Sequence, residues 1–387
     1  MYKIIFHSYL FLFIFNMINR EFGPLIDIRY IILALGIICI FHSILKRTKT
    51  SDKKTFGSII LFYSIIAISN ISYFNNSLLE VGESDFANLV LLNIFNFINI
   101  LALYLNSKLI TPKIVIKYLK ISVIFLTISI IWVALGQVLP FTTYSGLACG
   151  DGHTNLFQTG CRYAGYGVDP NYVTMIMVVF ITLLLKFEKK FSTKLIYIIL
   201  SLGLIAISFS KTILLTFIPI FIITFFLKKF KNDKKTINNL IFLTIMFLIF
   251  LPLVLKIIRP FDNLPTMNYR YMMWDAATDL FWKNPVIGNG IGSFRSYFFL
   301  TSNWFIQAHS TTMQILSEHG IMALIIFISI FIRILKKQNL HVSFLLLIYL
   351  AWATTYETLY LSFFAFFIAM IPNIGGEQNE KSNNISN

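Results

Sequence analysis

Long apolar runs follow one another along the whole chain, separated by short polar segments. Whole windows are apolar, without the period of 3.6 or 2 residues that marks a single buried face. Each run approaches the roughly 20 residues that an α-helix needs to cross a bilayer. The pattern predicts about twelve membrane-spanning helices, near residues 3–19, 28–45, 56–74, 87–105, 121–139, 170–185, 195–209, 212–227, 237–255, 310–334, 342–356 and 359–374.

The composition supports this interpretation, since 57% of the 387 residues are hydrophobic and only 13% are charged. We therefore expect an all-α, polytopic integral membrane protein with a single membrane domain, residues 1–387. Lys3 precedes the first apolar run, but no small-residue cleavage site follows, so we interpret this run as a span rather than a signal peptide. The polar tail, residues 375–387, is expected to be disordered and cytoplasmic.

The net charge of +15 could indicate nucleic-acid binding, but its distribution indicates membrane topology instead. Short loops rich in Lys and Arg remain in the cytoplasm. The basic clusters lie in alternate connections between the predicted spans, at Lys46–Lys54, Lys108–Lys120, Lys186–Lys194, Lys228–Lys235 and Arg333–Lys337. This pattern places both termini inside, and it leaves no basic surface for a nucleic-acid partner.

Two longer loops are then expected on the outer face, at residues 140–170 and 256–309. The second contains three of the five tryptophans and should fold on the membrane surface. Within it, Tyr269–Lys283 has the pattern of a short interfacial helix, and Asn284–Pro285 ends that helix. The segment Gly288–Gly292 follows. It reads as a tight turn with positive φ rather than a nucleotide-binding loop, because no strand precedes it.

Two cysteines, Cys149 and Cys161, lie in the first outer loop. A disulfide between them would close a short ring and contribute about 3 kcal/mol on the loop-entropy model. Two free thiols are the alternative, which an oxidising compartment disfavours.

His309 lies where the second loop re-enters the membrane, next to a predicted helix start capped by Ser310 or Thr311. The segment Thr311-x-x-Gln314 has the form of a capping box. The positive end of a helix dipole lowers the pKa of a histidine, and a neutral imidazole can act as a general base. A structural histidine in the headgroup region is an equal alternative from position alone.

Several cations are expected on the same membrane face. Lys211 interrupts a long apolar stretch, where it either faces a water-filled cavity or snorkels to the interface. Taken singly, Arg162 could form an ion pair with Asp151 or Asp169, and Arg270 and Arg295 could form ion pairs with Asp275 and Asp279. Together these cations favour a polyanionic ligand, because Arg and Lys are the usual phosphate-binding side chains.

Metal binding is not predicted, because the outer histidines lack metal-ligand spacing. Glu318 would face away from His309 on a shared helix, so we assign it a supporting role.

Four segments in order resemble the bacterial O-antigen polymerase and O-antigen ligase family of membrane glycosyltransferases. They are Arg162-x-x-Gly165 with Asp169-Pro-Asn171, Ser208-Phe-Ser-Lys-Thr212, Arg270-x-x-x-Trp274 through Pro285-x-x-Gly288-x-Gly290, and His309-Ser310 with Glu318-x-Gly320. The resemblance covers residues 162–333. Lys211 stands where the family usually has Arg, and Ser310 where it often has Asn. Lys keeps the positive charge but loses bidentate binding of phosphate.

The resemblance implies a GT-C-like fold and transfer of a glycan from polyprenyl pyrophosphate to a sugar hydroxyl, without metal or cofactor. Arg162, Lys211 and Arg270 would then bind the pyrophosphate, and His309 would act on the acceptor hydroxyl. Arg295, Asp275 and Glu318 would assist substrate binding. The partners would be the lipid-linked oligosaccharide, membrane lipids and a chain-length regulator.

Three functions follow from this reading. The favoured one is a repeat-unit polymerase for O-antigen or capsule, working on the periplasmic face of the bacterial inner membrane. The second is a ligase that moves glycan onto lipid A-core or a protein. The third is a flippase for the same lipid-linked sugars, which the lack of a visible internal repeat disfavours.

Overall fold

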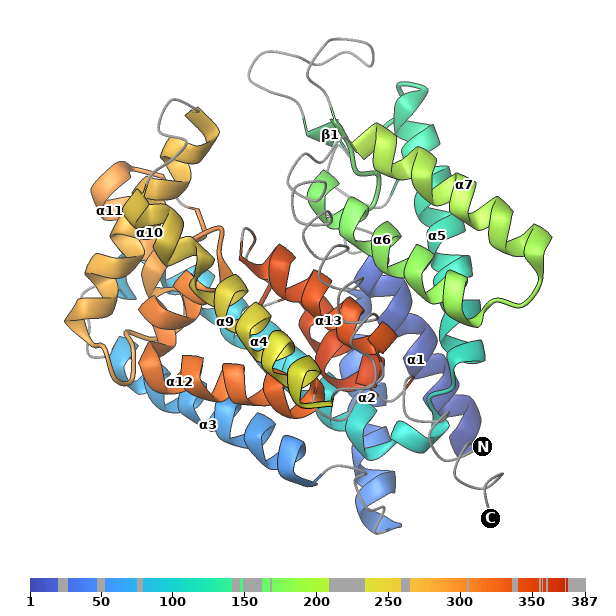
Figure 1. The fold of residues 1–387 in the computed structure, drawn as a ribbon, viewed down its shortest axis with the longest axis horizontal. Helices are drawn as coiled ribbons and strands as arrows, with labels where there is room; N and C mark the ends of the chain where they lie inside the picture. The colour runs from blue at the N-terminus through green and yellow to red at the C-terminus, as the bar shows by residue number, and fades with distance from the viewer. Residues whose placement is uncertain are drawn as a thin grey trace. The chain divides into compact units, whose positions relative to one another are not determined.

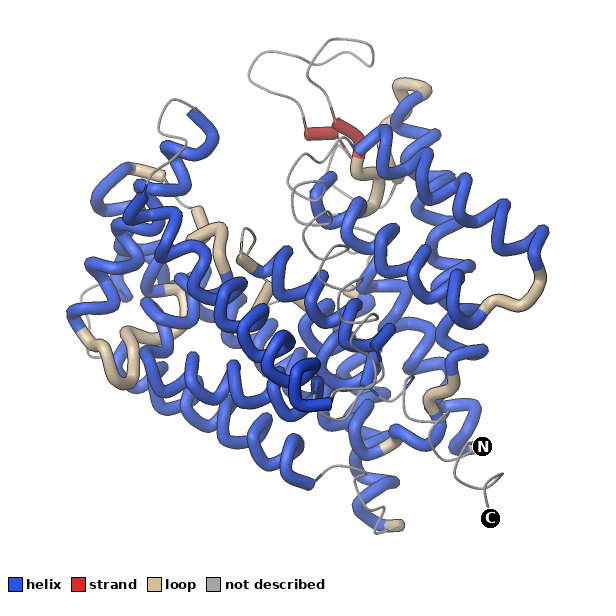
Figure 2. The backbone as a smooth tube through the Cα atoms, viewed as in Figure 1, coloured by secondary structure: helices blue, strands red, loops and turns tan. Residues whose placement is uncertain are grey.

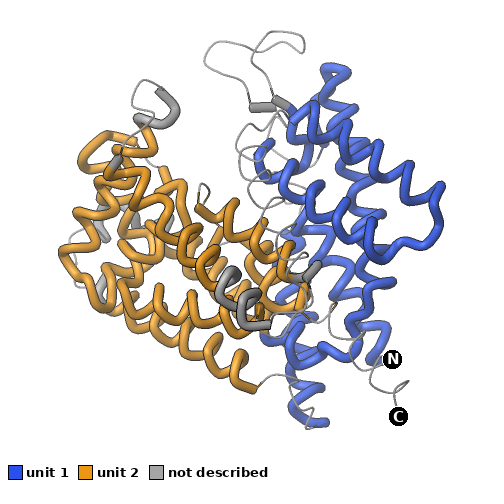
Figure 3. The backbone as a smooth tube through the Cα atoms, in the orientation of Figure 1, with its two compact units in different colours: residues 1–49, 101–218 blue, residues 50–100, 219–387 orange. Residues whose placement is uncertain are grey.

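The computed structural model describes the chain as an almost wholly helical protein (Figures 1 and 2). The described residues are 1–19, 27–46, 53–74, 79–140, 147–148, 162–167, 169–208, 234–258, 265–304, 306–335, 340–354, 356, 358–359, 361–372 and 374. Two compact units divide the chain, and each contains two separate stretches of sequence (Figure 3). Unit 1 comprises Met1–Lys49 and Leu101–Ile218, and unit 2 comprises Thr50–Ile100 and Pro219–Asn387.

Unit 1 is built from five long helices. They are α1 (Tyr2–Ile18), α2 (Ile28–Leu45), α5 (Pro112–Ala134), α6 (Pro170–Phe187) and α7 (Phe191–Ser208), with a short 3₁₀ turn η1 (Ser107–Leu109) before α5. Helix α1 packs on α2 and α5, and α6 packs on α5 and α7. The start of α6 explains one sequence motif, because the Asp169 carboxylate accepts a hydrogen bond from the Asn171 N–H at 2.6 Å and Pro170 takes the first helical position.

One short antiparallel pair, β1 (Leu147–Ala148) and β2 (Arg162–Tyr163), also belongs to unit 1. The register pairs Leu147 with Tyr163 and Ala148 with Arg162. The turn after β2 lies against α5, where the Tyr166 N–H donates to the Ser129 hydroxyl at 3.1 Å. Gly165 has φ 54°, and a Cβ there would lie 2.3 Å from Ser129 Oγ, so this close approach requires glycine.

Unit 2 contains the second half of the chain together with helix α3. Its helices are α3 (Lys53–Phe74), α9 (Lys234–Ile258), α10 (Pro265–Lys283), α11 (Ser293–Ser302), α12 (Thr311–Leu335), α13 (Leu340–Ala353) and α14 (Ser362–Ala365), which continues into a π-helical turn η2 (Phe366–Met370). Helix α12 is the centre, since it packs against α3, α9, α10, α11 and α13. The remaining helix, α4 (Leu79–Leu105), continues from unit 2 into unit 1.

Seven described helices are long and apolar enough to cross a membrane, and three shorter apolar helices add to them. The all-α polytopic prediction is therefore confirmed. The seven are Ile28–Leu45, Lys53–Ile71, Phe86–Leu105, Pro112–Ala134, Pro170–Phe187, Phe191–Ser208 and Thr311–Leu335. The three shorter ones, Tyr2–Ile18, Phe242–Ile257 and Ser343–Ala353, fall at predicted spans. The predicted span 212–227 lies outside the described residues, so the total of twelve stays a prediction.

One predicted boundary was wrong. Helix α5 begins at Pro112, not near 121, so the basic residues after it lie on the helix and not in a loop. Lys120 reaches Glu188 in an ion pair, and its ammonium lies 5.3 Å from the ring centre of Tyr197. Long lysine stems can cover apolar surface while the charged end finds a polar partner, which is why the charges do not end the helix.

Candidate functional site

Helix α12 is interrupted in the middle. Gly320 has φ 73° and ψ −177°, far from helical values, so the hydrogen-bond ladder breaks there. The loop 285–290 fills the break from outside the helix. The Ile321 and Met322 N–H groups donate to the carbonyls of Pro285 (2.9 Å) and Val286 (3.4 Å). In return the Gly290 N–H donates to the Glu318 carbonyl at 2.8 Å. Each of these hydrogen bonds replaces one that the helix loses at the break. Such replacement is needed inside a membrane, because no water is present there to bond to a free backbone group.

The predicted glycine turn is confirmed by this arrangement. Gly288, Gly290 and Gly292 all have positive φ, between 79° and 90°. Asn289 tightens the turn further, because its side-chain amide donates to the carbonyls of Leu280 (2.8 Å) and Ser317 (2.9 Å). The two motif segments Pro285–Gly290 and Glu318–Gly320 therefore form one structural joint.

Glu318 and His319 directly precede Gly320 in α12, and both are fully buried. One Glu318 carboxylate oxygen accepts a hydrogen bond from the Phe294 N–H at 3.3 Å, in the first turn of α11. His319 Nδ1 lies 2.8 Å from the Ser69 hydroxyl of α3. Glu318 therefore ties α11 to α12, and it does not line the pocket described below.

His309, two residues before the start of α12, has an unusual backbone conformation. Its φ is 47°, in the left-handed region that non-glycine residues rarely adopt. The residue before it is fixed from both sides. The Ala308 N–H donates to the Gln314 side-chain oxygen at 3.1 Å, and the Ala308 carbonyl accepts from the Trp274 indole N–H at 3.1 Å. These two bonds to Ala308 hold the strained His309 in place. Strained residues fixed in this way are often found at functional sites.

Ser310, rather than Thr311, caps α12. Its hydroxyl accepts a long hydrogen bond of 3.4 Å from the Met313 N–H. The Thr311 hydroxyl instead bonds to the Tyr356 carbonyl at 3.0 Å and to the Thr358 hydroxyl at 2.9 Å. The helix start is thus fixed to the segment after α13, and the expected capping box is replaced by the Gln314–Ala308 bond.

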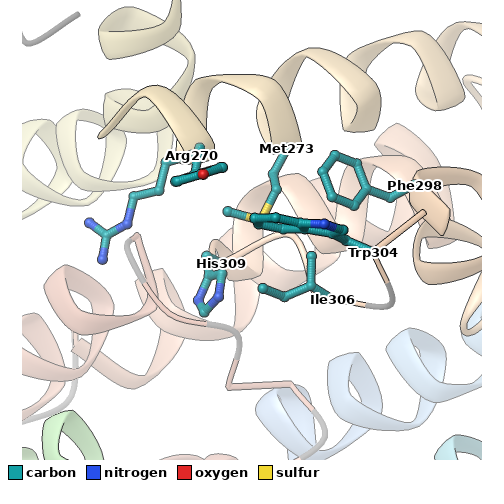
Figure 4. A pocket seen from close by; sticks show the side chains of 7 residues that line it. Arg270, Met273, Phe298, Trp304, Ile306 and His309 are labelled. Atoms are coloured by element: carbon teal, nitrogen blue, oxygen red, sulfur yellow. The ribbon is translucent and has the colours of Figure 1, made fainter. Parts of the chain in front are cut away.

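A pocket of about 240 Å³ opens beside His309 (Figure 4). Its lining comes from α10, α11 and the segment between α11 and α12, all in unit 2. The lining residues are Tyr269, Arg270, Met273, Phe298, Trp304, Ile306 and His309. Figure 4 shows Arg270 and Met273 extending from one helix toward the loop that carries His309. The pocket therefore combines one cation and one imidazole with an apolar wall.

The charges of the pocket are unusual. Burial, and after it the positive charge of Arg270, lowers the pKa of His309 from 6.5 to about 4. Burial also lowers the pKa of Arg270. Within the described residues, no hydrogen bond or ion pair engages the Arg270 guanidinium, and none engages the His309 imidazole. Among the described residues, a neutral imidazole thus lies beside a cation that no carboxylate pairs. The sequence predicted the lowered pKa but attributed it to the helix dipole.

The other outer-loop charges have different surroundings. Asp275 forms an ion pair with Lys256 of α9, at 3.3 Å, rather than with Arg270 or Arg295. Arg295 lies on α11 and does not line the pocket. The described residues contain no group of three or more His, Cys, Asp or Glu side chains that could hold a metal ion.

Two further predicted site residues belong to unit 1. Arg162 lies in β2, and its neighbour Tyr163 accepts a hydrogen bond at its carbonyl from the Ser208 hydroxyl at 3.3 Å. The end of α7 therefore lies beside β2, which brings the Arg162 segment next to the start of the Ser208–Thr212 segment. Lys211, Cys149 and Cys161 lie outside the described residues.

The sequence did not identify three parts of the site. Trp274 and Gln314 act through Ala308, and the aromatic wall comes from Tyr269, Phe298 and Trp304. A signal existed only for Gln314, whose spacing from Thr311 suggested a capping role. The other residues are ordinary apolar side chains whose contacts arise from long-range packing.

The apolar helices define a multi-pass membrane protein. Its candidate site is the pocket in unit 2. Comparison with known families is consistent with this. Residues 196–328, about a third of the chain, match the family model described as O-antigen ligase. The match supports the resemblance to the O-antigen polymerase and ligase family and indicates a membrane enzyme that processes O-antigen. No curated protein and no solved structure matches the chain.

Proposed function

We propose that the protein is a glycosyltransferase that polymerises repeat units of a bacterial surface polysaccharide. The donor is a glycan on polyprenyl pyrophosphate, and the acceptor is a sugar hydroxyl. The reaction takes place on the periplasmic face of the inner membrane. The observation that carries the proposal is that Arg270 and His309 line one pocket, where a cation with no carboxylate partner among the described residues accompanies a neutral imidazole.

The two groups suit the two ends of a displacement reaction. The acceptor oxygen forms a bond to the anomeric carbon while the bond from that carbon to the pyrophosphate oxygen breaks. His309 accepts the hydroxyl proton, and the leaving pyrophosphate keeps the electron pair. Arg270 stabilises the negative charge that develops on the leaving group. A bound pyrophosphate also offsets the effect of Arg270 on His309, so donor binding raises the basicity of the imidazole.

Arg162 and Lys211 are proposed as further pyrophosphate ligands. The support is the hydrogen bond from the Ser208 hydroxyl to the carbonyl of Tyr163, the residue that follows Arg162. Arg295 and Asp275 are proposed to assist from the second outer loop, and Glu318 is proposed to assist from α12 by fixing α11. The charges of these side chains supply the stabilisation, so the proposed reaction needs no metal.

The break in α12 does not favour a transporter. Broken helices in transporters bind substrate with their free backbone groups. Here the loop 285–290 pairs the N–H groups of Ile321 and Met322 and the carbonyls of Ser317 and Glu318. The backbone groups at this joint are therefore paired within the protein. The polar side chains that remain available to a substrate, Arg270 and His309, line the pocket instead.

The ligase alternative uses the same chemistry with another acceptor. The test is chain length on a gel, with protein purified in detergent and given lipid-linked repeat units. The wild type should lengthen the glycan. His309→Ala and Arg270→Ala should each reduce the rate at least a hundredfold, since loss of one preorganised charge contact costs roughly 10²-fold or more. Lys283→Ala, an exposed cation on the same helix, is the matched control and should retain activity.

Full activity in both pocket variants would contradict the proposal. Transfer to lipid A-core instead of another repeat unit would establish a ligase. A chain-length regulator, the proposed protein partner, should change the length distribution and not the initial rate.

A further inference from the structure

Beside Arg270 and His309, the pocket is lined by the aromatic side chains of Tyr269, Phe298 and Trp304. The rings of Tyr269 and Trp304 stack with centroids 5.0 Å apart and planes 27° from parallel. Both side chains are about half exposed, at 47% and 50%. Tyr269 lies on α10 and Trp304 follows α11, so the stack forms only when unit 2 folds.

Both members of the stack are held in place by their backbones. Trp304 directly follows the end of α11, where Asn303 has φ 60° and its N–H donates to the Phe299 carbonyl at 2.7 Å. The Trp304 N–H donates to the Ser302 hydroxyl at 3.3 Å. Tyr269 precedes Arg270 on α10. The aromatic surface is therefore fixed next to the cation and to the imidazole of the same pocket.

The shape and chemistry of the pocket select among ligands. At about 240 Å³ it lies below the roughly 300–1,000 Å³ of pockets for drug-sized ligands, so it holds a group of about one sugar ring. A hydroxyl must reach His309, and an apolar face must cover the stacked rings. A pyranose ring has both, with hydroxyls at its edge and C–H bonds on its faces. An isoprenoid chain has no hydroxyl for the imidazole.

We propose that the Tyr269–Trp304 stack binds the acceptor sugar ring and presents its hydroxyl to His309. This inference rests on the proposed function and assigns to it the acceptor subsite. Arg270 then divides the pocket, with the donor pyrophosphate on its side and the acceptor ring on the aromatic side. Exposed apolar side chains outside the pocket, such as Trp282, which is 70% exposed, face the surroundings and do not take part.

The kinetic test separates the two substrates. The acceptor probe is the repeat-unit oligosaccharide released from its lipid carrier by mild acid, and the donor is the lipid-linked form. Trp304→Ala should raise the KM for the released oligosaccharide about tenfold and leave the KM for the donor unchanged, as expected for the loss of one stacked aromatic ring. Trp304→Phe should restore most of the affinity. Trp282→Ala, a tryptophan outside the pocket, is the matched control and should leave both constants unchanged.

A raised donor KM with an unchanged acceptor KM would mean that the wall binds the lipid carrier, and the inference would be wrong. Unchanged constants in Trp304→Ala would also overturn it.

A binding measurement separates this inference from the proposed chemistry. Saturation-transfer NMR of the released oligosaccharide should show binding to His309→Ala protein and loss of that binding in the double variant His309→Ala, Trp304→Ala. If His309→Ala remains active while Trp304 is required for oligosaccharide binding, the role of His309 fails and the sugar subsite stands. If the oligosaccharide binds the double variant as well as the single one, the subsite fails.

Discussion

Gly288 and Gly320 lie against each other's backbone at the break in α12. A Cβ on Gly288 would lie 2.4 Å from the Glu318 carbonyl oxygen and from the His319 nitrogen. A Cβ on Gly320 would lie 2.4 Å from the Val286 carbonyl oxygen. Each glycine also has a positive φ, 86° and 73°. Both positions therefore require glycine for two independent reasons, conformation and contact with backbone that cannot move aside.

Alanine at either position should destabilise unit 2. The left-handed backbone alone costs about 1–3 kcal/mol for a residue with a side chain, and the backbone overlap adds to it. Thermal unfolding of the purified protein in detergent measures the loss. Gly57→Ala is the matched control in the same unit, because its Cβ would meet nothing within 4 Å and its φ is helical. Equal melting temperatures for all three variants would refute the structural role of the joint.

The sequence predicted most helices because continuous apolar runs are a local signal. It placed a helix at 269–283, where the structure has α10, and it predicted the glycine turn. It could not predict that residues 285–290 repair a break at Gly320, because this pairing joins segments about thirty residues apart through backbone groups. It identified His309 and Arg270 by their chemistry, but it did not predict the hydrogen bonds by which Trp274 and Gln314 hold Ala308. Packing contacts of this kind leave no local signal.

Membrane orientation gives a direct test of the charge pattern. We expect Lys46–Lys54 in the cytoplasm and Asn303 outside, because basic loops remain inside. Asn303 is exposed at the end of α11, so a cysteine there is accessible. In a variant with its native cysteines replaced by serine, a membrane-impermeant maleimide added to whole cells should label Asn303→Cys and not Lys53→Cys. Labelling of Lys53→Cys in intact cells would show that Lys46–Lys54 is outside and would contradict the predicted topology.

The disulfide expected between Cys149 and Cys161 can be tested directly. Both cysteines lie outside the described residues, so their pairing stays a prediction. Mass spectrometry of protein alkylated directly in the membrane should show both thiols protected. Alkylation of both without prior reduction would exclude the bond. Cys39 is a buried free thiol and serves as an internal reference after denaturation.

The pKa of His309 should depend on Arg270. Arg270 is the second cause of the lowered pKa, after burial. Arg270→Gln should therefore raise the pKa of His309 from about 4 part of the way toward 6.5, as measured by NMR of labelled imidazoles.

The lowered pKa of His309 should also make the folded protein sensitive to acid, and the sign of the effect follows from linkage. Between about pH 6.5 and 4 the unfolded histidine binds a proton that the folded one does not, so stability falls as the pH falls through this window. His309→Gln should remove that part of the acid sensitivity. An unchanged pKa in Arg270→Gln would show that the two groups do not interact.

Gln314 should act on the reaction through His309, although it does not line the pocket. Its side-chain oxygen accepts from the Ala308 N–H, and that bond holds the backbone that places His309 at φ 47°. Gln314→Leu leaves the buried N–H without a partner, which costs about 1–3 kcal/mol and frees the loop to relax. We expect kcat to fall about tenfold or more while the KM for the lipid-linked donor changes little. Gln314→Glu keeps an acceptor oxygen, so it should restore much of kcat. It should also move the acid limb of the pH profile upward, because the added negative charge favours protonated His309.

Ser317→Ala, a buried change on the same helix that does not touch Ala308, controls for general destabilisation. A purely structural role for Gln314 would lower the amount of folded protein equally in Gln314→Leu and Gln314→Glu and leave the pH profile of both unchanged.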